Sequence, residues 1–195
     1  GKGGGGVGII VRNDVVHVTT PHISNRNIEI MWLSIHRNSS RPLIIGVYYG
    51  QQESRVNKNE IEMEMNLLKE EIEEMKCEGE ILLAMDGNAK IGIIGEEISM
   101  NGRLNHDTNH STNLTLLTNS PICKGKITRK NTKNSKEKSA IDFVVASHSV
   151  TEMVTHMQID EDGVYKVKGK NETDHNTISI KININNINKE KKVKK

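Results

Sequence analysis

Two uninterrupted apolar runs constrain the fold of this chain more than any other feature. Residues 81–85 read Ile-Leu-Leu-Ala-Met, and residues 141–146 are apolar apart from a single Asp. Each run has the length of a β-strand. A strand with one solvated face alternates apolar and polar residues, so a continuous apolar run predicts a strand that is buried on both faces. The sequence therefore predicts a sheet whose central strands are covered on both sides.

Hydrophobic periodicity predicts further strands around these two. Val7, Ile9 and Val11 recur with a period of two, which is typical of a half-buried strand. Residues 28–35 and 43–49 predict two more strands with a turn between them, so the first third of the chain is expected to form a β meander. Residues 177–182 alternate again and predict a last strand.

Residues 57–77 follow a helical period instead. Asn57 or Asn59 can cap this helix, and Gly79 can end it. A shorter helix is expected to begin at Gly102, before the apolar residues 114–117. One face of the long helix carries its apolar side chains, at Ile61, Met65, Leu68, Ile72 and Met75.

Length and composition favour one domain with an aliphatic core. The chain has 195 residues, and only 3% of them are aromatic, so the core must be built from Ile, Val, Leu and Met. No apolar run approaches the roughly 18 residues of a membrane span, and no secretory signal is visible. We therefore expect a nuclear or cytoplasmic protein that is not secreted, with Cys77 and Cys123 as reduced thiols.

The net charge of +2 hides an uneven distribution. Acidic residues crowd positions 60–80, whereas bases crowd positions 124–138 and the last seven positions. Clustered cations displace counterions from nucleic acid, so the segment 124–138 is a candidate phosphate-binding loop without an aromatic residue to stack on a base. Its candidate nucleic-acid-binding residues are Lys124, Lys126, Arg129, Lys130, Lys133 and Lys136.

Three acidic positions lie at the edges of strand-like runs. They are Asp86, Asp142 and Asp174, and the last is followed by His175. Strand ends can hold side chains rigidly and still bring them together. Carboxylates with a histidine suit hard-cation chemistry on phosphate, although each position alone could equally be a turn or capping residue.

Taken in chain order, these segments resemble the motifs of the endonuclease/exonuclease/phosphatase superfamily. Met-Asp-Gly-Asn-Ala at 85–89 is similar to the family's Gly-Asp-Phe-Asn-Ala, and Ser-Ala-Ile-Asp-Phe at 139–143 to its Ser-x-Ile-Asp-Tyr/His. Thr-Asp-His at 173–175 is similar to Ser-Asp-His, and Val-Tyr-Tyr-Gly-Gln at 47–51 to Val-Tyr-x-Pro. With the glycine-rich approach at 5–11, the resemblance covers about residues 3–183.

The resemblance implies roles for three residues that would face the phosphate. Asp86 would orient or deprotonate the attacking water, and Asn88 would hold a phosphate oxygen. Gln51 stands where the family has Pro, so either Tyr48 or Tyr49 could be the tyrosine that steadies the transition state. We prefer Tyr49, two residues before Gln51.

The resemblance also implies a Mg²⁺ site, with Mn²⁺ as the alternative ion. Asp142 and Asp174 are the candidate metal ligands, and Asp142 could instead orient a partner. Asp174 would pair with His175 and fix its tautomer, so that the imidazole contacts the scissile phosphate.

Part of the family pattern has no counterpart in this sequence. The first strand with its Asn, and a Gln-Glu-Thr motif whose Glu binds Mg²⁺, normally precede the glycine-rich approach, and none of Glu29, Glu53 or Glu60 has that context. The expected fold is therefore an α+β, four-layer α/β/β/α sandwich, DNase I-like, incomplete at its N-terminus. It would span residues 1–183, with residues 184–195 as a basic tail or linker.

The implied activity is Mg²⁺-dependent nicking of DNA, impaired in this chain. The closest resemblance is to the endonuclease domains of non-LTR retrotransposons, whose parent proteins carry a downstream reverse transcriptase, or to a host gene of the craniofacial development protein 2 type. Two alternatives stay open: a phosphatase of the same superfamily, and an inactive nucleic-acid-binding remnant. The basic loop favours a polymeric phosphate backbone over a single phosphate group.

Overall fold

The larger of two packed sheets carries the buried strands. The computed structural model describes residues 6–15, 22–23, 26–37, 41–51, 57–88, 91–94, 97–100, 114–131, 137–165 and 173–183. Among them, six strands form this sheet in the order β1-β2-β3-β4-β11-β7. Their bounds are β1 His22–Ile23, β2 Glu29–Ile35, β3 Leu43–Tyr49, β4 Glu80–Asp86, β11 Asp142–Ser147 and β7 Leu114–Leu116.

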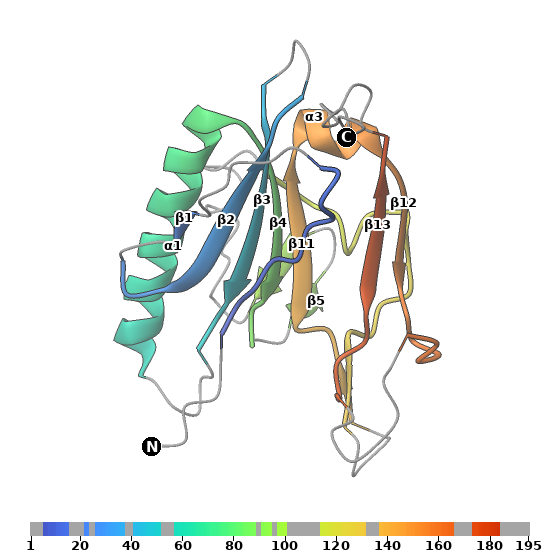
Figure 1. Cartoon of the computed structure of the whole chain (residues 1–195). Helices are drawn as coiled ribbons and strands as arrows, with labels where there is room; N and C mark the ends of the chain where they lie inside the picture. Colours follow the sequence, from blue (N-terminus) through green and yellow to red (C-terminus); the bar gives the residue numbers. More distant parts are fainter. Residues whose placement is uncertain are drawn as a thin grey trace.

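A smaller sheet packs against one face of the larger one (Figure 1). Its three strands run in the order β13-β12-β8, with β13 at Ile178–Ile182, β12 at Val154–Ile159 and β8 at Cys123–Lys124. Two hairpins complete the described strands: β9 Arg129–Lys130 with β10 Lys138–Ser139, and β5 Ile91–Ile94 with β6 Glu97–Met100. The short helix α3, His148–Met153, leads from β11 into β12.

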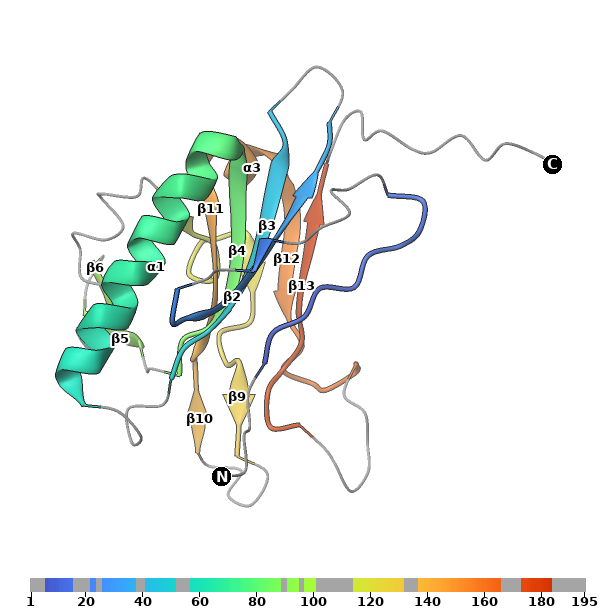
Figure 2. The same cartoon turned by 60° about the vertical axis from the view of Figure 1, so that its left-hand side comes forward.

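Helix α1, Lys58–Glu78, covers the other face of the larger sheet (Figure 2). Asn57 caps it, because the Asn57 side chain accepts from the Glu60 N–H and the Glu60 side chain accepts from the Asn57 N–H. Leu68 and Ile72 pack from α1 against the sheet. The helix ends at Gly79, where a Cβ atom would lie 2.5 Å from the Pro42 carbonyl oxygen.

Two hydrophobic clusters separate three layers: helix, sheet, sheet. One cluster lies between α1 and the larger sheet and contains Trp32 and Phe143. The other lies between the two sheets, where Leu82 and Val144 meet Met157. The α+β class with its two packed sheets is thus confirmed, and no outer helix covers the smaller sheet within the described part of the chain.

The apolar pattern predicted the strands of these layers well. The strands expected at 28–35, 43–49, 81–85, 141–146 and 177–182 appear as β2, β3, β4, β11 and β13, with ends within one residue. The helix expected at 57–77 appears as α1, and residues 114–116 form β7. The helix expected from Gly102 and the tail 184–195 lie outside the described residues. No described helix is long and apolar enough to cross a membrane.

The strand expected at residues 7–11 is wrong. This segment is assigned no strand, although its burial alternates as the sequence predicted. Ile9 and Val11 pack against the cluster between the sheets, whereas Ile10 is fully exposed. Alternation reports which side chains are buried, and here it does so in a segment that pairs with none of the described strands.

Candidate functional site

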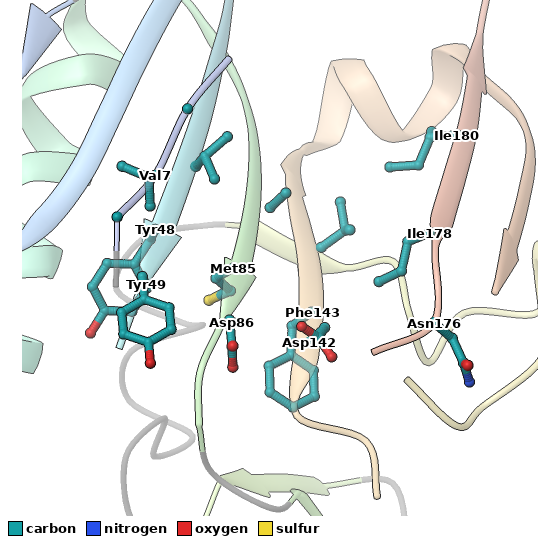
Figure 3. A pocket seen from close by; sticks show the side chains of 15 residues that line it. Val7, Tyr48, Tyr49, Met85, Asp86, Asp142, Phe143, Asn176, Ile178 and Ile180 are labelled. Atoms are coloured by element: carbon teal, nitrogen blue, oxygen red, sulfur yellow. The ribbon is translucent and has the colours of Figure 1, made fainter. Parts of the chain in front are cut away.

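The candidate site lies on the face of the larger sheet that meets the smaller sheet. Side chains alternate between the faces of a strand, so Leu82, Ala84 and Asp86 of β4 point away from α1. Asp142 of β11 is directly opposite Asp86 in an antiparallel ladder, and Tyr49 of β3 is opposite Asp86 in a parallel one. Figure 3 shows the side chains of the three strand ends beside one another.

His175 joins this group from the segment before β13. Its Nδ1 atom lies 3.0 Å from both carboxylate oxygens of Asp142, and its Nε2 atom lies 3.9 Å from Asp86 Oδ2. With Nδ1 as the donor, Asp142 fixes the tautomer and the plane of the imidazole. This hydrogen bond is also the main cause that raises the pKa of His175 above its ordinary value.

Asp174 does not take the role that the resemblance implied. Its Oδ2 atom accepts from Arg129 Nε at 2.6 Å, and its Oδ1 atom lies 3.8 Å from His175 Nε2. Burial alone would raise the pKa of Asp174, but the hydrogen bond and charge of Arg129 outweigh it and the pKa is lowered. The orienting partner of His175 is therefore Asp142, reached across the structure rather than along the chain.

Asp86 has the character of a proton acceptor. Its burial, and then the nearby charge of Asp142, raise its pKa above the ordinary value of a carboxyl. The Asn88 N–H and the charges of His175 and Arg129 act in the opposite direction. A carboxylate with a raised pKa holds a proton better near neutral pH, which suits a general base.

Asn88 ties two strand ends together. Its backbone has a φ of 45°, in the left-handed region that Asn tolerates, and its N–H donates to Asp86 Oδ1 at 3.0 Å. Its side-chain Nδ2 donates to the Gly50 carbonyl oxygen at 2.6 Å. One of the two Nδ2 hydrogens is thus engaged within the protein, and the other is the donor that a phosphate oxygen could use.

The alternation of side chains distinguishes the two tyrosines. Tyr48 points toward α1, where its hydroxyl donates to the buried carboxylate of Glu64 at 2.7 Å. Tyr49 occupies the opposite face, in register with Asp86. The geometry thus favours Tyr49 as the site tyrosine.

Thr128 and Asn176 hold the site together, and sequence reasoning missed both. The buried Thr128 hydroxyl oxygen accepts from the N–H groups of Ile141 and Asp142, at 2.9 and 3.0 Å. Asn176 Nδ2 donates to the Ile127 carbonyl oxygen, while Asn176 Oδ1 is buried without a hydrogen-bond partner in the described structure. A single Thr and a single Asn carry no spacing signal, so only the fold shows what they hold.

Asp86, Asp142 and His175 could hold a metal ion. One ligand atom from each lies within 4.8 Å of the others. Two carboxylates and an imidazole fit a divalent cation, because carboxylate oxygens suit hard ions and imidazole suits several transition metals. Asp174, expected as a ligand, is not in this group and is paired with Arg129 instead.

A pocket of about 380 Å³ extends from the site into the space between the sheets. Asp86 and Asp142 are its acidic lining residues, and Tyr49 and Asn176 also line it. The rest of its wall is mainly apolar, as Figure 3 shows for Val7, Ile178 and Ile180.

The basic segment 124–138 is partly ordered into strands. Within it, β8 and β9 are separated by residues 125–128, and β9 pairs with β10. Lys124 and Lys126 are exposed, Lys130 donates from Nζ to the Glu161 carbonyl oxygen, and Arg129 reaches Asp174. Lys133 and Lys136 lie outside the described residues.

Comparison with known proteins bears on the fold. No protein-family model and no curated protein matches the sequence. Among solved structures, the endonuclease domain of TRAS1, a telomere-specific non-LTR retrotransposon, matches with a TM-score of 0.56 and 19% identity. The match covers 78% of this chain and 63% of that domain, so the chain spans less than two thirds of its length.

Two bacterial enzymes match in the same way. The 3′-5′ exonuclease NExo from Neisseria meningitidis has a TM-score of 0.60 and 15% identity, over 86% of this chain and 72% of that one. A mannosyl-6-phosphatase from Bacteroides thetaiotaomicron has a TM-score of 0.52 and 14% identity, over 78% and 56%. An endonuclease/exonuclease/phosphatase family protein from Leptotrichia buccalis matches with a TM-score of 0.52. The chain has the endonuclease/exonuclease/phosphatase fold.

The solved structures that resemble this chain belong to proteins with different substrates. The similar structures are described as an endonuclease domain, an exonuclease and a sugar phosphatase. Phosphoester hydrolysis is common to these descriptions. Identities below 20% show the fold alone, so the reaction of this chain must be argued from its own site.

Proposed function

We propose that this protein hydrolyses phosphodiester bonds of nucleic acid with the help of a divalent cation. The observation that carries the proposal is the contact of His175 Nδ1 with Asp142 at 3.0 Å, while Nε2 faces Asp86. One carboxylate orients the imidazole, and the second is left to accept a proton. Both lie at strand ends on a fold shared with nucleases.

In this proposal the protein residues position water and phosphate. Asp86 accepts a proton from water as the water oxygen bonds to phosphorus, the P–O bond to one sugar breaks, and the leaving oxygen takes a proton from solvent. His175, protonated to a higher pH than a free imidazole, donates a hydrogen bond to a phosphoryl oxygen. A divalent cation held by Asp86 and Asp142 would neutralise charge on the phosphate, with Mg²⁺ preferred and Mn²⁺ able to replace it.

DNA is the proposed partner, through its phosphate backbone. Lys124, Lys126 and Lys138 are exposed on the segment that also supplies Arg129 to the site. Such a surface suits a polymer with many phosphates. Replacing Lys124 and Lys126 with Ala should weaken DNA binding and flatten its salt dependence, whereas replacing the exposed Lys58 of α1 should change neither. Equal effects from both surfaces would contradict this assignment.

Nicking of supercoiled plasmid tests the function. We expect slow conversion to open circles in Mg²⁺ or Mn²⁺, none in EDTA, and at least a hundredfold loss in His175→Ala. His148→Ala is the matched control, since His148 is exposed and pairs only with Glu152 among the described residues. Nicking that survives His175→Ala would overturn the proposal.

A second candidate function is hydrolysis of small phosphomonoesters, favoured by the likeness to a mannosyl-6-phosphatase. The same preparation, assayed with a sugar phosphate and with plasmid, separates the two. Release of phosphate from the sugar without nicking would favour the phosphatase. Tight DNA binding without either reaction would favour an inactive binding protein.

We further propose that an additional carboxylate upstream would raise the activity. The sequence has no counterpart of the family's metal-binding Glu, and the described cluster supplies only two carboxylates. A version of the chain extended upstream in its parent gene should nick faster than the 195-residue chain in Mg²⁺. Equal rates would show that the described residues already complete the site.

A further inference from the structure

Arg129 differs from the other bases of its segment. Lys124 and Lys126 are exposed, and Lys130 bonds to the carbonyl of Glu161, away from the acidic cluster. Arg129 instead turns into the site, where its Nε atom donates to Asp174 Oδ2 at 2.6 Å. The Arg129 side chain is still 42% exposed, so it borders the site rather than being buried under it.

The backbone holds Arg129 beside His175 from both sides. Arg129 and His175 form an antiparallel bridge, and the Lys130 N–H donates to the Asp174 carbonyl oxygen at 2.8 Å. On the other side, the Asn176 N–H donates to the Thr128 carbonyl oxygen at 2.6 Å. The Arg129 side chain therefore starts next to the imidazole, and its position does not depend on the Asp174 contact alone.

The guanidinium keeps donors available after it binds Asp174. A guanidinium has five N–H groups in a planar fork, and the Asp174 contact uses the one on Nε. The structure gives the terminal nitrogens no hydrogen-bond partner among the described residues. A planar fork with free terminal N–H groups matches two oxygens of a phosphate, which an ammonium group cannot do in the same way.

We propose that Arg129 is a phosphate-binding residue of the candidate active site. Its terminal N–H groups hold a non-bridging oxygen of the phosphate that His175 and Asp86 face, and Asp174 fixes the guanidinium from behind. Arg129 thus belongs to the reaction centre, and the exposed lysines to the surrounding surface. That the phosphate is a phosphodiester of nucleic acid rests on the proposed function, whereas the contact with phosphate itself does not.

Binding of inorganic phosphate, followed through the ring signals of His175 by NMR in EDTA, tests this role without catalysis. A charge-assisted pair contributes about 1.5–3 kcal/mol, so Arg129→Ala should weaken phosphate binding roughly ten- to a hundredfold. Arg129→Lys should lose several-fold, because it keeps the charge without the fork. Lys58→Ala, which removes an exposed cation on α1, should stay within about twofold of wild type.

A competing explanation is that Arg129 only neutralises Asp174. That explanation predicts that Arg129→Ala/Asp174→Asn, which removes both charges, recovers phosphate binding. Our proposal predicts that the double variant stays as weak as Arg129→Ala. If Arg129→Ala unfolds, Arg129→Gln replaces it, since Gln keeps an N–H donor for Asp174. Recovery of phosphate binding in the double variant overturns the proposal. Wild-type affinity for phosphate in Arg129→Ala, or in Arg129→Gln where it replaces that variant, also overturns it. Loss of phosphate affinity in a chain that never nicks DNA would leave Arg129 assigned and reject the nuclease function.

Discussion

Protonation of His175 should make the stability of the fold depend on pH. The hydrogen bond to Asp142 raises the pKa of His175 above the value of 6.5 for a free imidazole. A raised pKa means that protonated His175 stabilises the fold fully below about pH 6.5, and that this contribution is lost as the pH rises through the folded-state pKa. The difference in melting temperature between wild type and His175→Gln should therefore shrink with rising pH.

Thermal unfolding from pH 5.5 to 8.5 measures this difference, with the exposed His148→Gln as control. NMR titration adds a direct readout, because Asp142→Asn should lower the pKa of the His175 ring. A gap between wild type and His175→Gln that widens with pH would contradict the assigned hydrogen bond.

The two tyrosines should separate stability from activity. Tyr48→Phe removes a donor from the buried Glu64 carboxylate and should cost about 1–3 kcal/mol of unfolding free energy. Tyr49→Phe should change stability by less than about 0.5 kcal/mol and lower nicking instead. Urea unfolding and plasmid nicking on both variants provide the measurements. The reverse pattern would show that Tyr48 is the residue facing the substrate.

At the residue scale, the sequence predicted the residues of the candidate site better than it predicted the contacts between them. Asp174 and His175 are neighbours in the chain, which favoured their pairing. Asp174 lies at a bend and accepts from Arg129, however, and His175 meets Asp142 through the fold. Thr128 and Asn176 could not be predicted, because a hydroxyl or amide that satisfies backbone groups leaves no pattern in one sequence.

Among the elements, the residue just before β9, Thr128, is joined to the start of β11 through one hydroxyl. Thr128→Val keeps the shape of the side chain but leaves the N–H groups of Ile141 and Asp142 without their acceptor, at a cost of about 1–3 kcal/mol. Thr128→Ser keeps the acceptor and loses one buried methyl group, about 0.8 kcal/mol. In urea unfolding, Thr128→Val should therefore have a lower free energy of unfolding than Thr128→Ser. Equal losses would mean that packing, not hydrogen bonding, gives Thr128 its role.

The length of a strand determined whether the hydrophobic periodicity of the sequence could predict it. Strands β2, β3, β4 and β11 each run for six or seven residues, long enough to show burial on one or both faces. The paired strands β9 and β10 have two residues each and cannot display a period. Strand β12, Val154–Ile159, was also missed, because His156 and Gln158 interrupt its apolar residues.

For the molecule as a whole, a bound divalent cation should stabilise the fold. The partly buried side chains of Asp86 and Asp142 face each other in the site. A ligand that binds only the folded state adds about 2.7 kcal/mol at a hundredfold excess over its Kd. Mn²⁺ or Mg²⁺ should raise the melting temperature of wild type, and EDTA should reverse the shift.

The matched variants locate the ion. Asp86→Asn and Asp142→Asn should abolish the shift, whereas Glu62→Gln on the exposed side of α1 should keep it. A shift that persists in both site variants would place the cation elsewhere on the protein.

The layered architecture was predictable because apolar runs require cover on both faces, and the motif order pointed to the same fold. The pocket between the sheets was not, since its volume depends on how side chains from Val7 to Ile180 pack in three dimensions. Sequence patterns report which residues avoid water, and they do not report how completely those residues fill the space between layers.

The pairing of Tyr49 and Asp142 with Asp86 across two ladders limits how this chain can change in length. One residue inserted within β4 ahead of Asp86 would turn its carboxylate toward α1, among apolar side chains, although every motif residue would still be present. Two inserted residues would restore the face but shift the carboxylate by roughly 7 Å along the strand. In related sequences, insertions and deletions should therefore occur in the loops between the strands, while β3, β4 and β11 keep their lengths.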